Sequence, residues 1–279
     1  MMKSYAMVID VAKCTGCYNC LLACKDEHCG EVFPGYAEAQ PMTGQFWINL
    51  IEKERGSYPK VKLSYTPIPC MHCRNAPCIE AAKNNAVYRR DDGTVIIDPE
   101  KAVGQEQIVS ACPYRVIFWN AEKNVPQKCT MCAHLLDQGW KQPRCAEMCP
   151  TDAIIFGDIN DPESEISKII TSIEPYSLHP EYNLAERVLY LNVPKMFIAG
   201  TVVHKDTDQC AKEITVTLKN GGIIKSCITD AFGDFWFENL DSRTDYLLEI
   251  EQEGFRKISQ RIHTYNDVNI GELFLEKIT

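Results

Sequence analysis

The sequence predicts an α+β chain in which a cysteine-rich domain is followed by an all-β domain. Thirteen of its fifteen cysteines lie before residue 150, and only Cys210 and Cys227 follow. Short strand-like segments with long loops surround the cysteine groups, whereas seven regularly spaced strand-like segments follow residue 196. Regular short strands separated by turn residues are typical of a sandwich. We therefore expect domains over 1–173 and 197–279, joined by a connecting segment over 174–196.

Composition narrows the possible functions. With 45% hydrophobic and 24% charged residues, the 279-residue chain reads as a soluble globular protein. Its net charge of −9 and the lack of a basic stretch argue against nucleic-acid binding. The N-terminus does not resemble a secretion signal, and no run approaches the ~18 apolar residues of a membrane span. We expect a cytoplasmic chain without membrane insertion, where crowded cysteines bind metal more often than they form disulfides.

In the first domain, Tyr5–Val11 alternates as a strand does, and Ala86–Asp98 predicts two strands around an Asp92-Gly93 turn. Ala153–Phe156 predicts a further short strand. Metal crosslinks would make the long loops between these strands tolerable.

A helix is expected to start at Asp161-Pro162-Glu163, since Asp is a favourable N-cap and Pro fits the first helical position. Four isoleucines then share one helix face, Ile166, Ile169, Ile170 and Ile173. This face predicts packing on the helix's own domain, with docking of a partner as the alternative. The tyrosine-rich stretch over 174–196 is expected to be irregular.

The second domain is predicted from seven candidate strands, namely FIAGTVVH, EITVTLK, IIKSCIT, DFWFENL, DYLLEIE, RKISQRIH and VNIGELFL. Asn220-Gly221-Gly222 and the 230–233 segment mark turns between them. The stretch TDAFGDFWFENL resembles carboxypeptidase-regulatory-like domains, which implies an immunoglobulin-like sandwich. No catalytic constellation is visible here, and Cys210 and Cys227 are expected to be small core residues.

The first cysteine group has a specific spacing. Cys14, Cys17, Cys20 and Cys24 form a C-x2-C-x2-C-x3-C run. In two-cluster ferredoxins the first three cysteines of such a run bind one [4Fe–4S] cluster and the fourth binds another. Lone C-x2-C pairs are compatible with zinc, but this run is hard to reconcile with a tetrahedral zinc site.

The last group repeats the run with an insertion, as Cys129-x2-Cys132-x12-Cys145-x3-Cys149 followed by proline. The crossing rule then predicts two ligand sets. Set A comprises Cys14, Cys17, Cys20 and Cys149. Set B comprises Cys24, Cys129, Cys132 and Cys145.

The middle group is half of a third such module. Cys70, Cys73 and Cys78 are followed by Ala82 where a fourth cysteine is expected. Cys112 ends a motif whose first three positions are Ala102, Gln105 and Ile108. All four ligands of one cluster are thus missing together, and the crossing rule predicts set C as Cys70, Cys73, Cys78 and Cys112. The alternative is that Cys112 is a stray buried thiol.

Other residues near the motifs are assigned supporting roles. His72 and His134 are expected to lie around the clusters or at the surface, because cysteines already supply the ligands. Trp47, Trp119 and Tyr114 are expected to pack around the clusters rather than to form an electron route. Cys29 fits no motif position and is expected to be unligated.

The stretches MVIDVAKC, PCMHCRNAPC, DPEKA, ACPY and QKCTMCAHLLD resemble the iron–sulfur subunits of molybdenum or tungsten enzymes of the dimethyl-sulfoxide-reductase family. Such subunits commonly hold four clusters. Loss of one cluster and an added sandwich are similar to the small subunits of pyrogallol–phloroglucinol transhydroxylases and related aromatic hydroxylases and dehydroxylases. This resemblance extends over nearly the whole chain.

The resemblance implies a heterodimer in which this chain, with three [4Fe–4S] clusters and no catalytic residue, transfers electrons. The large partner subunit would hold Mo or W with a bis-pyranopterin and bind the phenolic substrate. Two alternatives remain, an electron-transfer subunit of a respiratory molybdopterin reductase and a structural zinc protein.

Overall fold

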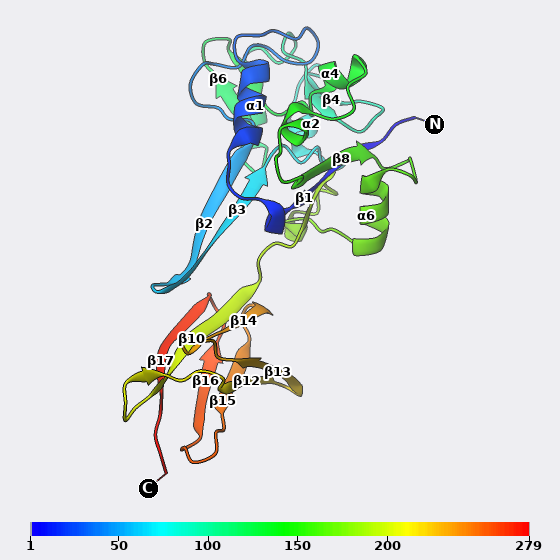
Figure 1. Cartoon of the computed structure of the whole chain (residues 1–279). Coiled ribbons are helices and arrows are strands. Elements are labelled where there is room, and N and C mark those ends of the chain that lie inside the picture. The colour runs from blue at the N-terminus through cyan, green and yellow to red at the C-terminus, as the bar shows by residue number, and fades with distance from the viewer. Residues whose placement is uncertain (1, 279) are drawn as a thin grey trace. The chain divides into compact units, whose positions relative to one another are not determined.

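The structure is a computed structural model that describes residues 2–278 (Figure 1). It divides into two compact units. Unit 1 contains Met1–Glu52 and Ser64–Val193, and unit 2 contains Lys53–Leu63 and Pro194–Thr279. The strands β2 (Asn49–Ser57) and β3 (Lys60–Ile68) form a two-stranded hairpin whose tip belongs to unit 2.

Unit 1 is built from short elements. Its α-helices are α1 (Asn19–His28), α2 (Pro77–Ala81), α3 (Gln107–Ser110), α4 (Ala133–Asp137), α5 (Arg144–Glu147) and α6 (Glu165–Ile173), and its 3-10 turns are η1 (Val11–Lys13) and η2 (Pro180–Tyr182). Its other strands are β1 (Tyr5–Asp10), β4 (Val87–Arg89), β5 (Val95–Ile97), β6 (Phe118–Asn120), β7 (Val125–Gln127), β8 (Ile154–Asp158) and β9 (Val188–Leu191). Over residues 2–278, no helix has both the length and the apolar character needed to cross a membrane.

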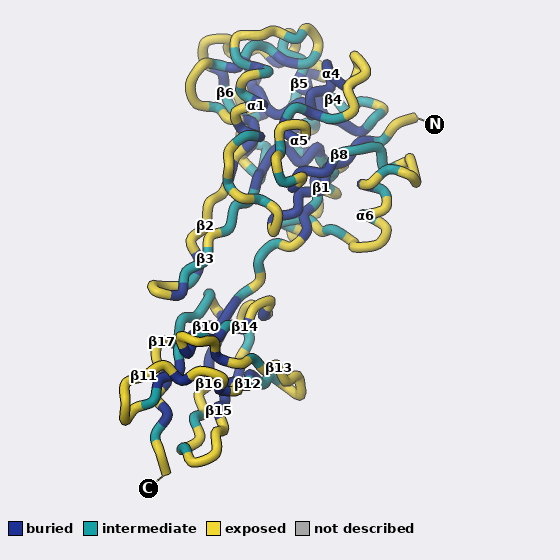
Figure 2. Tube along the Cα trace, viewed as in Figure 1, coloured by how far each residue is buried: buried dark blue, intermediate teal, exposed yellow. Residues whose placement is uncertain are grey.

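A three-stranded sheet with the order β8-β1-β9 organises unit 1. The central strand β1 runs antiparallel to β8 and parallel to β9. All six residues of β1 are buried, as the dark blue trace in Figure 2 shows. Met7 and Ile9 face the core that contains the motif cysteines, whereas Ala6 and Val8 face a smaller core. One strand therefore supports the cysteine loops on one side and α6 on the other.

Several predicted elements of unit 1 are confirmed. β1 occupies the expected strand, β8 covers the strand expected at Ala153–Phe156, and β4 pairs antiparallel with β5 across the Asp92-Gly93 turn. The segment over 174–196 was expected to be irregular, but the structure places the strand β9 within it. Val188 and Tyr190 of β9 are fully buried against β1, a parallel pairing between distant segments that no local pattern signals.

The predicted helix start is wrong by one turn. α6 begins after Ser164, whose hydroxyl accepts a hydrogen bond from the Ser167 N–H at 3.2 Å. The Asp161 carboxylate instead accepts from the Glu163 N–H at 3.0 Å and closes a turn before the helix. Ile166 is fully buried against β1 and β8, which confirms packing within the domain, whereas Ile173 is exposed.

Unit 2 is a sandwich of two four-stranded sheets. One sheet contains β10 (Met196–His204), β11 (Gln209–Cys210), β14 (Asp234–Leu240) and β17 (Val268–Leu275). The other sheet contains β12 (Thr215–Asn220), β13 (Ile223–Ile228), β15 (Asp245–Ile250) and β16 (Ile258–His263). All seven predicted strands are confirmed, and β11 is an additional two-residue strand.

The sandwich core is formed by alternate side chains of both sheets. Ile198 and Phe235 of one sheet meet Val216 and Leu248 of the other in one buried cluster. Cys227 packs partly buried against this core, but Cys210 is exposed, so its predicted core position is wrong. Cys210 lies on the short edge strand β11, where only one neighbour, β10, is available to cover it.

The hairpin tip in unit 2 was not anticipated from the sequence. Arg55 forms a bidentate ion pair with Asp267, with Nη2–Oδ1 at 2.6 Å and Nε–Oδ2 at 2.9 Å. Both side chains are buried, and Asp267 also accepts from the Phe197 N–H at 3.0 Å. A Cβ on Gly56 would lie 2.6 Å from the Phe197 ring, so the tip requires glycine at this close approach.

Candidate metal centres

The first motif folds as a tight loop leading into α1. Gly16 (φ +71°) and Tyr18 (φ 62°) adopt left-handed conformations, and a Cβ on Gly16 would lie 2.5 Å from the Tyr65 ring. The loop therefore requires glycine at this position. Cys20 and Cys24 lie one turn apart on α1 and are both buried. One short helix thus carries a cysteine of set A and a cysteine of set B.

The four cysteines of set A line one cavity, here called cavity A. Cys149 reaches this wall from the far end of the domain, after α5. The Ala153 N–H donates to Cys149 Sγ at 3.3 Å. Although burial alone would raise it, hydrogen bonds from Thr151 and Ala153 hold the pKa of Cys149 below its usual value.

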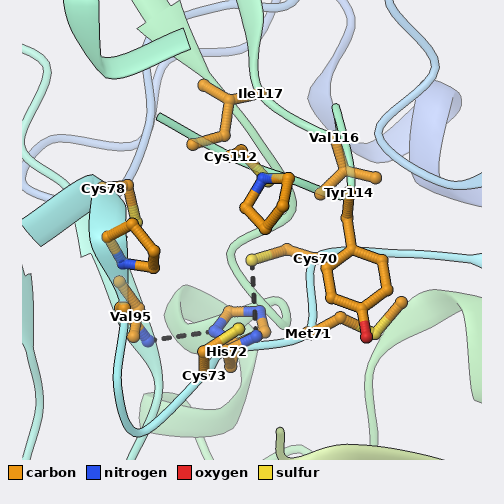
Figure 3. A pocket seen from close by; sticks show the side chains of 13 residues that line it. Cys70, Met71, His72, Cys73, Cys78, Val95, Cys112, Tyr114, Val116 and Ile117 are labelled. Atoms are coloured by element: carbon orange, nitrogen blue, oxygen red, sulfur yellow. Dashed lines mark hydrogen bonds between the residues drawn. The ribbon is translucent and has the colours of Figure 1, made fainter. Parts of the chain in front are cut away.

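The four cysteines of set C line a second cavity, here called cavity C (Figure 3). Cys112 lies in this wall together with Tyr114, although the sequence separates it from Cys78 by 34 positions. His72, with φ 44°, turns the chain so that its N–H donates to Cys70 Sγ at 3.4 Å. This placement favours Cys112 as a ligand over the stray-thiol alternative.

The cysteines of set B are all buried: Cys24 lies on α1, Cys145 lies on α5, and Cys129 and Cys132 lie in the loop before α4. Met131 and Cys132 adopt left-handed conformations, and the Met131 N–H donates to Cys129 Sγ at 3.3 Å. The thiols of Cys24 and Cys145 interact electrostatically with those of Cys129 and Cys132. The structure thus brings together all four predicted members of this set.

Burial governs the protonation of these thiols when no metal is bound. It raises the pKa of Cys20 and Cys132 to about 12 and that of Cys78 and Cys129 to about 11. Neutral thiols must lose their protons to become metal ligands, so metal binding is coupled to proton release.

Set B lies close to both of the other sets. Cys20 of set A interacts electrostatically with Cys24 and Cys145 of set B. At the other side, the Cys129 thiol of set B interacts electrostatically with the Cys70 thiol of set C. Set B thus has neighbours in both of the other sets.

The positions of the missing fourth cluster are filled by packing. Ala102 and Ile108 are fully buried, with Ala82 packed against the same core as Cys78. Gln105 occupies a motif position where a cysteine would be expected. Its Oε1 accepts a hydrogen bond from the Lys83 N–H at 2.8 Å, and its Nε2 donates to the Lys101 carbonyl at 2.7 Å. Apolar side chains therefore fill these positions, and the polar atoms of Gln105 are satisfied by hydrogen bonds within the protein.

The two motif histidines lie beside the sets. His72 is fully buried in the wall of cavity C, and its Nδ1 accepts from the Val95 N–H at 2.9 Å. Its Nε2 then carries the proton and has no partner within residues 2–278. His134 is also buried, and its Nε2 lies 2.9 Å from Glu27 Oε1. Burial holds the pKa of His72 well below its usual value, so the ring is neutral.

Of the three aromatic residues expected to pack around the clusters, Tyr114 and Trp47 lie beside the cysteines and Trp119 does not line either cavity. Tyr114 lines cavity C and donates to Glu186 Oε1 at 2.7 Å, and Trp47 is fully buried in the core shared with the cysteines. Trp119 lies on β6, where its carbonyl accepts from Gln45 Nε2 at 2.5 Å, and it lines neither cavity. Cys29 also lines neither cavity, and its Sγ lies 3.5 Å from Met42 Sδ.

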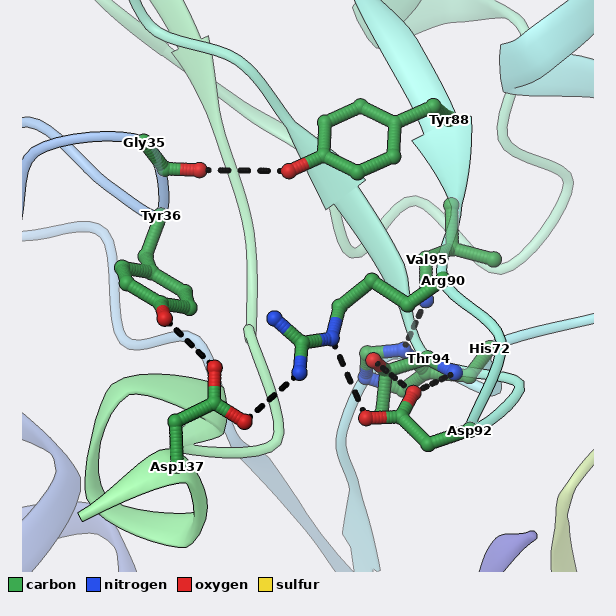
Figure 4. A network of polar contacts seen from close by, with 9 residues as sticks. All are labelled: Gly35, Tyr36, His72, Tyr88, Arg90, Asp92, Thr94, Val95 and Asp137. Atoms are coloured by element: carbon green, nitrogen blue, oxygen red, sulfur yellow. Dashed lines mark hydrogen bonds and ion pairs between the residues drawn. The ribbon is translucent and has the colours of Figure 1, made fainter. Parts of the chain in front are cut away.

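A polar network braces the wall of cavity C (Figure 4). Arg90 bridges Asp92 (Nε–Oδ2 3.0 Å) and Asp137 (Nη2–Oδ1 2.7 Å), and Tyr36 donates to Asp137 as well. Although burial would raise it, hydrogen bonds from Arg90 and Tyr36 hold the pKa of Asp137 below its usual value. The hairpin that carries Val95 is thereby tied to α4, which follows Cys132.

One buried cation near these sets was missed from the sequence. Lys128, directly before Cys129, is 3% exposed and donates through Nζ to the carbonyls of Val95 and Cys129. Lysine is almost never fully buried without a partner, so the residue type alone predicts a surface position. Its place beside a motif cysteine was the one available signal.

The donor sets fit [4Fe–4S] clusters. Soft thiolates with backbone N–H donors to sulfur are the usual surroundings of such clusters. The buried Nε2–H of His72 is a further donor in the wall of cavity C. Within residues 2–278 no three His, Cys, Asp or Glu side chains converge on a point suited to a single metal ion. All fifteen cysteines are free thiols rather than disulfides.

Comparisons with known proteins agree with this chemistry. A family model of the 4Fe–4S dicluster domain matches residues 61–159, and a model of the carboxypeptidase regulatory-like domain matches residues 198–270. Over 261 residues the chain is 44% identical to the pyrogallol hydroxytransferase small subunit of Pelobacter acidigallici, covering 91% of this chain and 92% of that protein.

Two further relatives share less of the chain. It is 34% identical over 221 residues to a candidate iron–sulfur subunit of dimethyl sulfoxide reductase from Halobacterium salinarum, covering 68% of this chain and 80% of that protein. It is 29% identical over 233 residues to the arsenate respiratory reductase iron–sulfur subunit of a Shewanella species, covering 66% and 94%. The chain belongs to the family of iron–sulfur electron-transfer subunits of molybdopterin oxidoreductases of the dimethyl-sulfoxide-reductase type.

Proposed function

We propose that this chain carries three [4Fe–4S] clusters, held by sets A, B and C, and serves a large catalytic subunit that acts on phenolic aromatics. The observation that supports the cluster count is the grouping of the cysteines. Four motif cysteines line each of two cavities, and the other four, Cys24, Cys129, Cys132 and Cys145, are all buried. When bound, such clusters supply reversible one-electron transfer.

The residues of this chain have distinct tasks in that proposal. The twelve thiolates hold the iron, and the N–H groups of His72, Met131 and Ala153 donate to ligand sulfurs. Apolar walls that include Val95 and Ile117 keep water from cavity C. No residue of the chain is assigned to substrate chemistry, so the partner would hold Mo or W with a bis-pyranopterin and bind the substrate in a cytoplasmic heterodimer.

The proposal of a phenolic substrate rests on the share of this chain that each relative covers. The pyrogallol hydroxytransferase small subunit matches over 91% of this chain, a span that includes much of the sandwich. The two reductase subunits match over 68% and 66% of it. A respiratory reductase remains the second candidate, because those reductase subunits are also related in sequence.

The partner and the assay decide between these candidates. We expect the chain to be isolated with a large subunit that contains Mo or W, and the complex to convert pyrogallol-type phenols. Because this chain has no substrate-binding metal centre, the separated small subunit is expected to convert none. Phenol turnover by the small subunit alone would contradict the proposal, and a complex that reduces only inorganic or S-oxide acceptors would support the respiratory alternative.

A further inference from the structure

The buried ammonium of Lys128 is joined to the walls of two cysteine sets. Its Nζ donates to the Cys129 carbonyl at 3.1 Å, and Cys129 belongs to set B. It also donates to the Val95 carbonyl, and Val95 lines cavity C together with Cys78. The side chain therefore places a positive charge between the sites of two clusters.

This charge has no anionic partner among the side chains that the structure describes. Lys128 is 3% exposed, and no carboxylate of residues 2–278 lies within 4.0 Å of its Nζ. A buried ammonium held only by carbonyl groups is costly unless a negative charge lies nearby. Thiolate-bound clusters have net negative charge, which increases by one electron on reduction. The sites of sets B and C are thus where the missing negative charge would reside.

Val95 makes the connection to cavity C specific. It accepts from Lys128 through its carbonyl, and it donates through its N–H to His72 Nδ1 at 2.9 Å (Figure 4). His72 in turn gives its own N–H to Cys70 Sγ. Lys128 is therefore anchored to the part of β5 that also orients a wall residue of set C.

We propose that Lys128 is a tuning residue whose fixed positive charge raises the reduction potentials of the clusters in sets B and C above what the cysteines alone would give. The effect on set A is smaller, because neither Val95 nor Cys129, whose carbonyls hold the ammonium, lines cavity A. This inference rests on the proposed function, since it requires clusters at these sites. It goes beyond that function by assigning to one lysine a difference between the reduction potentials of the three clusters.

The test is a reductive titration of the full iron-loaded chain, followed by low-temperature EPR, for the native protein and for Lys128→Gln and Lys128→Arg. Lys168→Gln is the matched control, because Lys168 is exposed on α6 and paired with Glu163. We expect Lys128→Gln to keep its iron while the potentials of two clusters shift to more negative values and the third shifts less. Lys128→Arg and Lys168→Gln should titrate as the native chain does.

The assignment of the shifted signals uses Cys112→Ala, which should remove the signal of set C. Unshifted potentials in Lys128→Gln, or an equal shift of all three clusters in both Lys128 variants, would overturn the proposal. If Lys128→Gln does not take up iron, Lys128→Arg decides: native iron and potentials support the role of charge, and loss of iron in both variants refutes it. A native chain without iron–sulfur clusters would instead refute the proposed function.

Discussion

At the scale of single residues, cysteine spacing predicted more than any other feature of the sequence. The members of set C are spread over 43 positions from Cys70 to Cys112, yet they line one cavity. The crossing rule expects each short loop to present three sulfurs on one side and to direct the fourth to its neighbour. Lys128 was not predicted, since lysine is usually exposed and one of the two carbonyls that hold its ammonium belongs to the distant Val95.

Cys112 provides the first residue-scale prediction. If it completes set C, Cys112→Ala should damage that cluster alone, because thiolate bonds hold the inorganic core in the chain. Iron should fall from about twelve to between about eight and eleven atoms per chain, with about four irons in each cluster. Iron analysis and low-temperature EPR of the reduced protein measure this.

Cys29→Ala is the control for that experiment. Cys29 lies beside Met42 and lines neither cavity, so its removal should leave the iron content unchanged. Three intact clusters in Cys112→Ala would show that Cys112 is only a remnant of the motif and that another residue completes the site.

At the scale of elements, local patterns predicted strands well and missed contacts between distant segments. The seven strands of the sandwich are short strand-like stretches separated by turn residues, so their positions followed from local sequence. The β2–β3 hairpin was missed because its tip is stabilised by Phe197 and Asp267, which lie far along the chain. The start of α6 was misplaced because Asp161 and Ser164 are both good caps, and the turn closed by Asp161 decided between them.

The hairpin tip gives a prediction about stability. Asp267→Asn leaves the Arg55 guanidinium buried without its charged partner, which typically costs about 3–5 kcal/mol. We expect the free energy of unfolding of unit 2 to fall by roughly this amount. Denaturant unfolding followed by the fluorescence of Trp236, which lies in β14, measures the change.

Asp241→Asn is the matched control, because Asp241 pairs with Lys195 at the surface, where ion pairs contribute about 0–1 kcal/mol. Equal losses in the two variants would contradict a special role for the buried pair. Replacing Arg55 and Asp267 together by apolar residues should cost less than Asp267→Asn alone, since no unpaired charge remains.

At the scale of the whole molecule, the chain combines two kinds of stabilisation. Unit 1 has short helices and strands around buried sulfur, so metal binding is expected to contribute directly to its folding. Unit 2 has a conventional apolar core between two sheets. Removing iron with a chelator should therefore loosen unit 1 far more than unit 2, and limited proteolysis of the iron-free chain should leave a resistant fragment that contains the sandwich.

The measurement that tests the central claim most directly is iron and acid-labile sulfide in the anaerobically prepared full chain. Three [4Fe–4S] clusters on twelve cysteines predict about twelve iron atoms and about twelve sulfides per chain, with no zinc in the sites. Ala102 and Ile108 are packed in the core and Gln105 is hydrogen-bonded within the protein, so we expect no fourth cluster at these positions. A count near sixteen iron atoms, or zinc in place of iron and sulfide, would contradict the assignment of the three sets.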